Sequence, residues 1–85
     1  EMKSWVEQFE EEGQFTGEDT AHTLKLHLTA VSHYEEKELA DKVVKHMESF
    51  KLLLDHQREN GLIAEEAYHT LKASTHYLIE KWQKS

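Results

Sequence analysis

Residues 39–61 read LADKVVKHMESFKLLLDHQRENG and decide the fold class. Their apolar side chains recur at intervals of three and four positions, which places them on one face of a helix. The series consists of Leu39, Val43, Met47, Phe50 and Leu54, continued by Gln57. A spacing this close to a heptad is typical of the narrow seam between packed helices. Asn60-Gly61 marks the C-terminal end, because glycine readily adopts the left-handed conformation that follows many helices. The segment predicts a helix over residues 38–59.

The same helical period occurs on both sides of this segment. Before it, an apolar stripe predicts a helix over residues 18–36, and after it a third stripe predicts a helix over residues 64–83. A shorter stripe over residues 2–12 is closed by Gly13. We therefore predict an all-α fold, a small antiparallel helical bundle of three long helices plus a short N-terminal helix.

Two details of this arrangement stay open in the sequence. Residues 34–38 contain no helix-breaking residue, so one continuous helix is an alternative to two. We favour a break, because a span beyond about 25 residues is long for a globular helix. The short helix is expected to cover an end or a side of the bundle, with the face of the second helix near Leu26 and Ala30 as the predicted contact. Ala64 stands where a Ser or Asp cap would stabilise the last helix better.

Length and charge limit the function. With 85 residues the chain is expected to form one domain, residues 1–85, which we interpret as a module excised from a larger protein. The formal charge of −7 argues against direct binding of nucleic acid, because phosphate binding needs clustered positive charge. Cysteine is absent, and no apolar run approaches the roughly 20 residues that span a bilayer. We therefore expect neither a cysteine metal site nor membrane insertion.

Histidine is unusually frequent, with seven residues. A zinc site on one helix needs two ligands three or four positions apart, and no two histidines have that spacing. Mixed pairs such as Glu65 with His69 have it, but this is also the spacing of ordinary helix salt bridges. We predict no metal site and interpret the histidines as solvated, with His27 and His46 at the edge of the core. A histidine-dependent metal or pH sensor is a minor alternative.

Catalytic signatures are lacking as well. There is no glycine-rich phosphate loop. The neighbours Ser32-His33 and Thr75-His76 have no third group in the pattern that would orient them. The 17 acidic residues are spread along all the predicted helices, so no glycosidase-like carboxylate pair stands out. The sequence therefore predicts a protein without enzymatic activity and without a cofactor.

Side chains outside the helix seams are the candidates for partner binding. Trp5 and Trp82 lie near helix ends, where one ring face can stay in contact with water, and Tyr77 points away from the stripe of its helix. Such rings stack on sugar rings or hold a partner's side chain. The alternative is that both tryptophans belong to the core. A second candidate set, for dimerisation, consists of Leu26, Ala30 and Leu52.

Four stretches, read together, resemble a known family. They are WVEQFEEEG at residues 5–13, HLTAVSHYE at 27–35, KHMESFKLLL at 45–54 and AYHTL at 67–71. Along essentially its whole length the chain resembles the FIMAH domain, a small helical module at the C-terminal end of many secreted proteins of Firmicutes, particularly bacilli. Because these motifs are mostly core positions, the resemblance implies a fold more strongly than an activity. It transfers no catalytic residue to this chain.

The resemblance implies an accessory role and a secreted, extracellular location within a larger protein. Parent proteins of such modules are large extracellular enzymes such as polysaccharide lyases, glycosidases, nucleases and proteases. We expect a non-catalytic module that aids attachment to the cell surface, the substrate or a partner domain. Its partner would be the parent enzyme's catalytic domain, a cell-wall component or a polysaccharide. The alternative is a structural module, monomer or weak dimer, that packs on its parent or dimerises without a free ligand.

Overall fold

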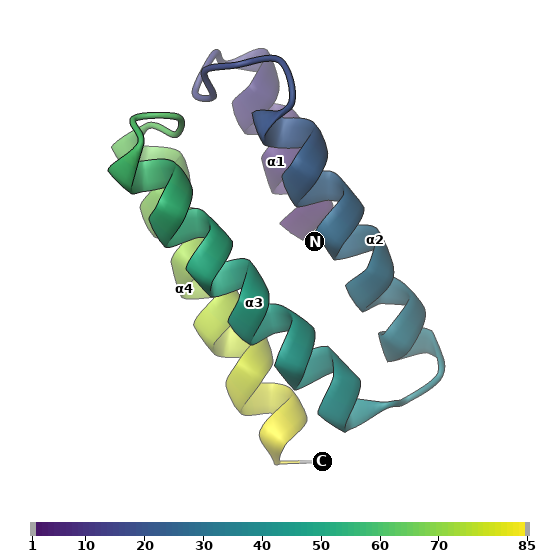
Figure 1. The fold of residues 1–85 in the computed structure, drawn as a ribbon. Coiled ribbons are helices and arrows are strands. Elements are labelled where there is room, and N and C mark those ends of the chain that lie inside the picture. The colour runs from purple at the N-terminus through teal and green to yellow at the C-terminus, as the bar shows by residue number, and fades with distance from the viewer. Residues whose placement is uncertain (1, 85) are drawn as a thin grey trace.

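Four helices make up the structure, a computed structural model that describes residues 2–84; the ends of the predicted domain, Glu1 and Ser85, lie outside it. The helices are α1 (Met2–Glu11), α2 (Thr20–Glu36), α3 (Ala40–Glu59) and α4 (Glu65–Gln83). They run alternately up and down, and the described residues contain no β-strand (Figure 1). The prediction of a small all-α antiparallel bundle with one short N-terminal helix is confirmed.

The helices form a square in cross-section. Within residues 2–84, the backbone of α1 packs against α2 and α4, and that of α3 packs against the same two helices, whereas the backbones of the diagonal pairs stay apart. At a rise of 1.5 Å per residue, α1 is about 15 Å long and α4 about 28 Å. The N-terminal end of α1 accordingly lies near the middle of the bundle (Figure 1). Within residues 2–84, α1 therefore lies beside only about half of the length of α4.

The core lies along the axis of this square. Its largest fully buried side chains include Phe50, Leu24, Met47, Leu54 and Leu71. Three of these belong to the α3 stripe that predicted the fold, and every helix contributes at least one buried residue. No helix in the described part of the chain is long and apolar enough to cross a membrane.

The structure contains the predicted break between α2 and α3, although residues 34–38 include no helix-breaking residue. The N–H of Glu38 donates to the carbonyl of Glu35 at 3.0 Å, and the N–H of Leu39 donates to that of Tyr34 at 3.0 Å. This pattern is a Schellman motif, which requires a left-handed residue directly after the C-cap. Glu38 supplies it with φ +56°, where α1 and α3 use glycine. A glutamate in a glycine position explains why the sequence shows no helix breaker here.

At the opposite end of the bundle, the α1–α2 loop pairs with the α3–α4 loop. Phe15 and Ile63 form an antiparallel bridge, and the N–H of Ala64 donates to the carbonyl of Gln14 at 2.8 Å. The side-chain oxygen of Gln14 accepts the N–H of Ala67 at 3.0 Å. Ala67 is the third residue of α4, whose first N–H groups have no partner within the helix. Gln14 therefore provides, from a distant loop, the cap that Ala64 cannot provide.

The contact predicted for the short helix is wrong. Two polar pairs join α1 to α2: Lys25 Nζ lies 3.0 Å from a Glu10 carboxylate oxygen, and Lys3 Nζ donates to the Thr29 hydroxyl at 3.1 Å. Leu26 and Ala30 each follow these contacts by one residue, which places them about 100° further around α2. Leu26 is accordingly 58% exposed and is not covered by α1.

Candidate ligand-binding groove

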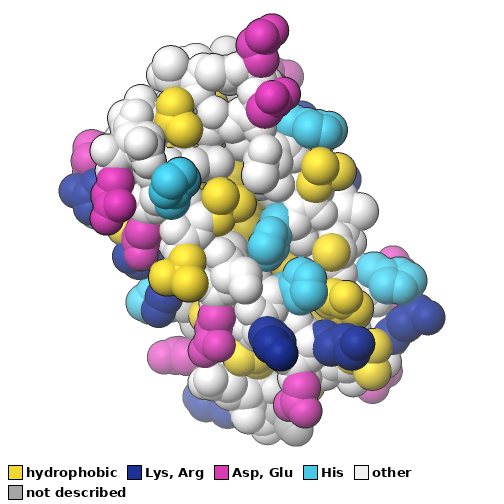
Figure 2. All heavy atoms as spheres, in the orientation of Figure 1, with side chains coloured by type: hydrophobic (Ala, Val, Ile, Leu, Met, Phe, Trp, Pro, Cys, Tyr) yellow, Lys and Arg dark blue, Asp and Glu magenta, His cyan; other side chains and the backbone are white. Residues whose placement is uncertain are grey.

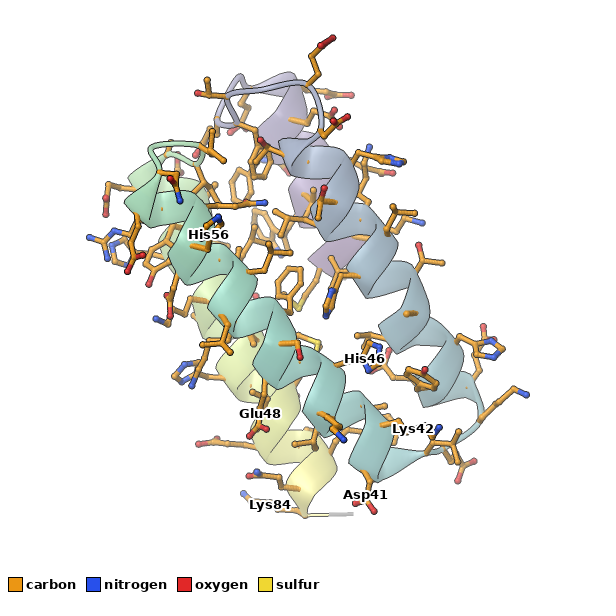
Figure 3. All side chains as sticks on the ribbon, viewed as in Figure 1. Asp41, Lys42, His46, Glu48, His56 and Lys84 are labelled. Atoms are coloured by element: carbon orange, nitrogen blue, oxygen red, sulfur yellow. The ribbon has the colours of Figure 1, made fainter. Side chains whose placement is uncertain are left out.

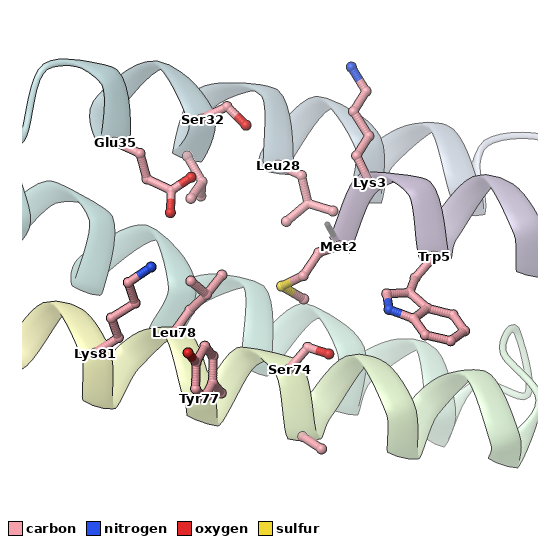
Figure 4. Close-up of a pocket in the computed structure, with 12 residues that line it drawn as sticks. Met2, Lys3, Trp5, Leu28, Ser32, Glu35, Ser74, Tyr77, Leu78 and Lys81 are labelled. Carbon is pink, nitrogen blue, oxygen red and sulfur yellow. The ribbon is translucent and has the colours of Figure 1, made fainter.

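A groove of about 520 Å³ opens where α1 ends, between α2 and α4 (Figure 4). The end of α1 contributes Met2, Lys3 and Trp5; α2 contributes Leu28, Val31, Ser32 and Glu35; and α4 contributes Ala73, Ser74, Tyr77, Leu78 and Lys81. A volume of this size lies within the range of small-molecule sites.

The floor and the rim of the groove differ in character. The floor residues Met2, Leu28 and Val31 are 9%, 4% and 2% exposed, so they already belong to the core. The rim carries two aromatic side chains that remain in contact with solvent, Trp5 at 40% and Tyr77 at 65% exposed. The groove therefore offers a ligand aromatic surface at its edges rather than an open apolar floor.

The two aromatic residues stand on different walls. Trp5 comes from α1, and its ring lies 5.5 Å from that of Phe9 at 23° between the planes, a stacked pair. Tyr77 comes from α4, and Ser74 lies between the two rings along the groove (Figure 4). Because Phe9 is buried, the stack holds the Trp5 ring against a fixed support.

Polar groups enter the groove from both walls. Glu35 on α2 and Lys81 on α4 reach in from opposite sides (Figure 4). One Glu35 carboxylate oxygen accepts the indole N–H of Trp82 at 3.2 Å, which links α2 to the last turn of α4. Ser32 and Ser74 add hydroxyl groups, of which Ser74 donates to the carbonyl of Thr70 at 3.0 Å.

The structure brings two of the three predicted aromatic site residues into one site. Trp5 and Tyr77 both line the groove. Trp82 is half-buried and lines a separate hollow of about 370 Å³ between the start of α3 and the end of α4, beside Asp41 and Lys45. A binding role for these residues stays a prediction.

The three residues predicted for dimerisation lie elsewhere. Leu52 on α3 is 67% exposed, Leu26 on α2 is also exposed, and Ala30 is half-buried. None of them lines the groove or the smaller hollow. A role in an interface likewise stays a prediction.

Sequence reasoning did not select the polar lining of the groove. Ser32 and Glu35 are three positions apart on α2, and Ser74 and Lys81 are seven apart on α4, so each pair lies on one helix face. That spacing is a signal, but solvated helix faces show it as well. Only the packing of the helices reveals that these two faces border a groove.

Several histidines lie beside hydrophobic side chains on the face formed by α2 and α3 (Figure 2), whereas His69 and His76 belong to α4. His46 lies between α2 and α3 (Figure 3), where its ring is 5.4 Å from that of His27 and 4.8 Å from that of Tyr34. His27 Nε2 donates to the His46 carbonyl at 2.9 Å. Both rings are half-buried and the other five histidines are exposed. Residues 2–84 contain no group of three side chains placed to hold a metal ion.

A cluster of polar side chains links α3 to α4 away from the groove. Asp55 Oδ1 accepts hydrogen bonds from Lys72 Nζ at 2.7 Å and from the Tyr68 hydroxyl at 2.5 Å, and Lys72 also donates to that hydroxyl at 2.8 Å. The hydrogen bond from Lys72, followed by that from Tyr68, lowers the pKa of Asp55. The hydrogen bond to Asp55 raises the pKa of Lys72. Each group has its partner, so the cluster stabilises the contact between the two helices.

Comparison with known proteins gives one finding. A family model described as the FIMAH domain matches residues 1–80 of the chain. The matched range contains every residue that lines the groove except Lys81. No curated protein and no solved structure matches the chain.

Proposed function

The chain belongs to the FIMAH domain family, and on this basis we propose that it is a non-catalytic accessory module that holds a partner in the groove between α1, α2 and α4. The module would be part of a secreted protein and would keep a catalytic domain close to its substrate or to the cell surface. The observation that carries the proposal is an open groove with two exposed aromatic rings on its rim, Trp5 and Tyr77.

The groove is suited to binding because its walls are fixed before a ligand arrives. The floor is part of the core, Trp5 is stacked on Phe9, and Glu35 is hydrogen-bonded to Trp82. A site that needs little rearrangement loses little conformational entropy on binding. Rigid helices therefore favour this groove over the loops as the place where a partner is held.

The polar lining favours binding over catalysis. No histidine lines the groove, so neither Ser32 nor Ser74 has an imidazole base beside it there. Glu35 is the groove's carboxylate, and it already accepts a hydrogen bond from Trp82. This set of groups offers hydrogen bonds and stacking surfaces, which are what recognition requires.

Binding can be tested by titrating the isotope-labelled chain with purified peptidoglycan fragments, teichoic acid, polysaccharides and the parent's catalytic domain while amide and indole NMR signals are followed. We expect one partner class to shift the Trp5 indole signal and the amides around Tyr77. Tyr77→Ala should weaken that binding, whereas Leu52→Ala, a similarly exposed position outside the groove, should not. Absence of binding to all four classes, or binding that maps to Leu26 and Leu52, would overturn the proposal.

Dimerisation is a second candidate function, favoured by the exposure of two leucines on the outer faces of α2 and α3. Leu26 and Leu52 both have more than half of their surface in solvent. If they form an interface, sedimentation equilibrium should show a dimer that Leu52→Glu dissociates. A monomer at millimolar concentration would remove this candidate.

A further inference from the structure

We propose, on the premise of the binding function above, that the groove takes a neutral polysaccharide whose sugar rings stack on Trp5 and Tyr77. Three properties of the groove lead to this ligand class: a closed floor, two exposed aromatic rings, and a lining of hydroxyl and charged groups that does not favour a polyanion.

The closed floor argues against a helical peptide as the occupant. An amphipathic helix binds a groove by burying an apolar stripe against an exposed apolar surface. Here Leu28 and Val31 are already almost fully buried by the bundle itself, so a docked helix would remove little additional apolar area from water. The groove is therefore a poor receptor for a separate amphipathic helix.

The aromatic rims fit a sugar chain instead. A pyranose ring has apolar C–H faces and a polar edge of hydroxyl groups, and its C–H faces stack on exposed aromatic rings. Trp5 is held by its stack on Phe9, so its orientation is set before binding. Tyr77 offers a second, more exposed ring on the opposite wall (Figure 4). Two rings at different positions along the groove suit a ligand with several rings.

The polar lining suits the hydroxyl edges of the same ligand. Ser32 and Ser74 can donate and accept hydrogen bonds, and Glu35 can accept them. A carboxylate can accept several hydrogen bonds, so Glu35, which accepts one from Trp82, keeps the capacity to accept another from a ligand hydroxyl. On α4 the lining extends from Ala73 to Lys81, about 12 Å by helical rise, which accommodates a short oligosaccharide segment.

The net charge of the molecule favours neutral polysaccharides over acidic ones as the ligand. The chain carries a formal charge of −7, which repels teichoic acids and acidic polysaccharides at long range. The groove lining itself holds two lysines, Lys3 and Lys81, and one glutamate, Glu35, so its net charge of +1 is small beside the −7 of the whole chain. A neutral glycan meets no such repulsion and needs only stacking and hydrogen bonds.

Isothermal titration calorimetry with soluble neutral oligosaccharides tests the proposal, using the cello-, xylo-, malto- and chito-oligosaccharide series against the purified chain. We expect one series to bind with an affinity that changes little between low and high salt. Tyr77→Ala and Trp5→Ala should each weaken binding about tenfold, because each removes one stacking surface. Tyr77→Phe and Trp5→Phe keep a ring and should retain binding within about threefold, while Leu52→Ala serves as the unaffected control.

The outcomes separate this proposal from the one it rests on. If no neutral oligosaccharide binds but Tyr77→Ala weakens binding to the catalytic domain or to a wall fragment, the glycan assignment is wrong and the groove function stands. If teichoic acid or polygalacturonate binds and salt abolishes that binding, the ligand is a polyanion and the proposal is overturned. If a glycan binds equally to the wild type and to both ring-retaining and ring-deleting variants, the groove is not its site. Trp5→Phe and thermal denaturation of each variant show whether a loss of binding is caused by unfolding.

Discussion

At the scale of single residues, Glu38 occupies a left-handed backbone position that is usually taken by glycine. Its φ of +56° lies in the left-handed region, which costs a residue with a Cβ roughly 1–2 kcal/mol. The two hydrogen bonds of the Schellman motif and the packing of α2 against α3 hold it there. These contacts, and not the conformational preference of Glu38 itself, therefore determine the conformation of the turn.

Glu38→Gly should therefore stabilise the protein. We expect the free energy of unfolding to rise by about 1 kcal/mol, because glycine removes the left-handed strain and its greater freedom in the unfolded chain offsets only part of that gain. Urea denaturation followed by circular dichroism measures the change. Glu36→Gly, two residues earlier at the last residue of α2, is the matched control and should not raise stability, because that position has helical backbone angles. A loss of stability in Glu38→Gly would contradict the argument.

At the scale of elements, α4 depends on a cap that comes from another part of the chain. Gln14→Ala removes the acceptor for the Ala67 N–H and should lower the free energy of unfolding by about 1 kcal/mol, the usual cost of losing an N-cap. Thermal or urea denaturation measures it. Gln8→Ala is the control, since Gln8 donates only to Glu12 on the surface of α1 and its loss should change stability little. Equal effects of the two substitutions would show that Gln14 does not act as a cap.

The contact between α3 and α4 should depend on acidity through Asp55. Its pKa in the folded protein is lowered below the usual 3.8, first by the hydrogen bond from Lys72 and then by that from Tyr68. The unfolded chain therefore binds the proton more readily, so this stabilisation is fully present above pH 3.8 and is lost as the pH falls through the folded value. The raised pKa of Lys72 keeps that side chain charged throughout the neutral range.

Asp55→Asn should accordingly reduce stability at pH 7 by at most about 1 kcal/mol, because the pair is partly exposed to solvent. The difference from the wild type should shrink as the pH falls below 3.8. Urea denaturation at a series of pH values measures both quantities, with Glu48→Gln on the exposed face of α3 as the control. A difference that stays constant down to pH 2 would exclude the ion pair as its cause.

The helices also show which parts of the structure could be predicted from the sequence. The apolar spacing around Met47 and Phe50 predicts α3 and the all-α fold, because burial follows helical period. The face on which α1 packs and the cap from Gln14 could not be predicted, since both depend on contacts between residues far apart in the chain. Trp5 and Tyr77 could be selected as exposed rings, but their meeting in one groove depends on how α1 packs against α2 and α4.

At the scale of the whole molecule, the groove is formed where three helices meet. Within residues 2–84, α1 covers α2 and α4 near the paired loops, and the groove opens beside Met2 and Trp5 between those two helices. Leu28 and Val31 line it and are still almost fully buried. A partner held there would therefore contact the exposed rings of Trp5 and Tyr77 more than the floor.

The charge of the whole molecule should control its association. At neutral pH a formal charge of −7 keeps copies apart. Five of the seven histidines are exposed, and seven added positive charges would cancel the formal charge of −7. Exposed apolar side chains such as Leu26 and Leu52 then meet less repulsion between copies.

Sedimentation velocity should therefore show a monomer at pH 7.5 and self-association at about pH 5.5, since histidine generally titrates between these values. Added salt at pH 7.5 should reproduce part of the effect, because screening weakens the same repulsion without protonating any group. Leu52→Glu provides the matched control: it keeps the histidines, adds one negative charge at an exposed apolar position, and should reduce the association in acid. An unchanged monomer at both pH values would show that repulsion is not what keeps the copies apart. The exposed leucines would then lack the complementarity that an interface needs, whatever the charge around them.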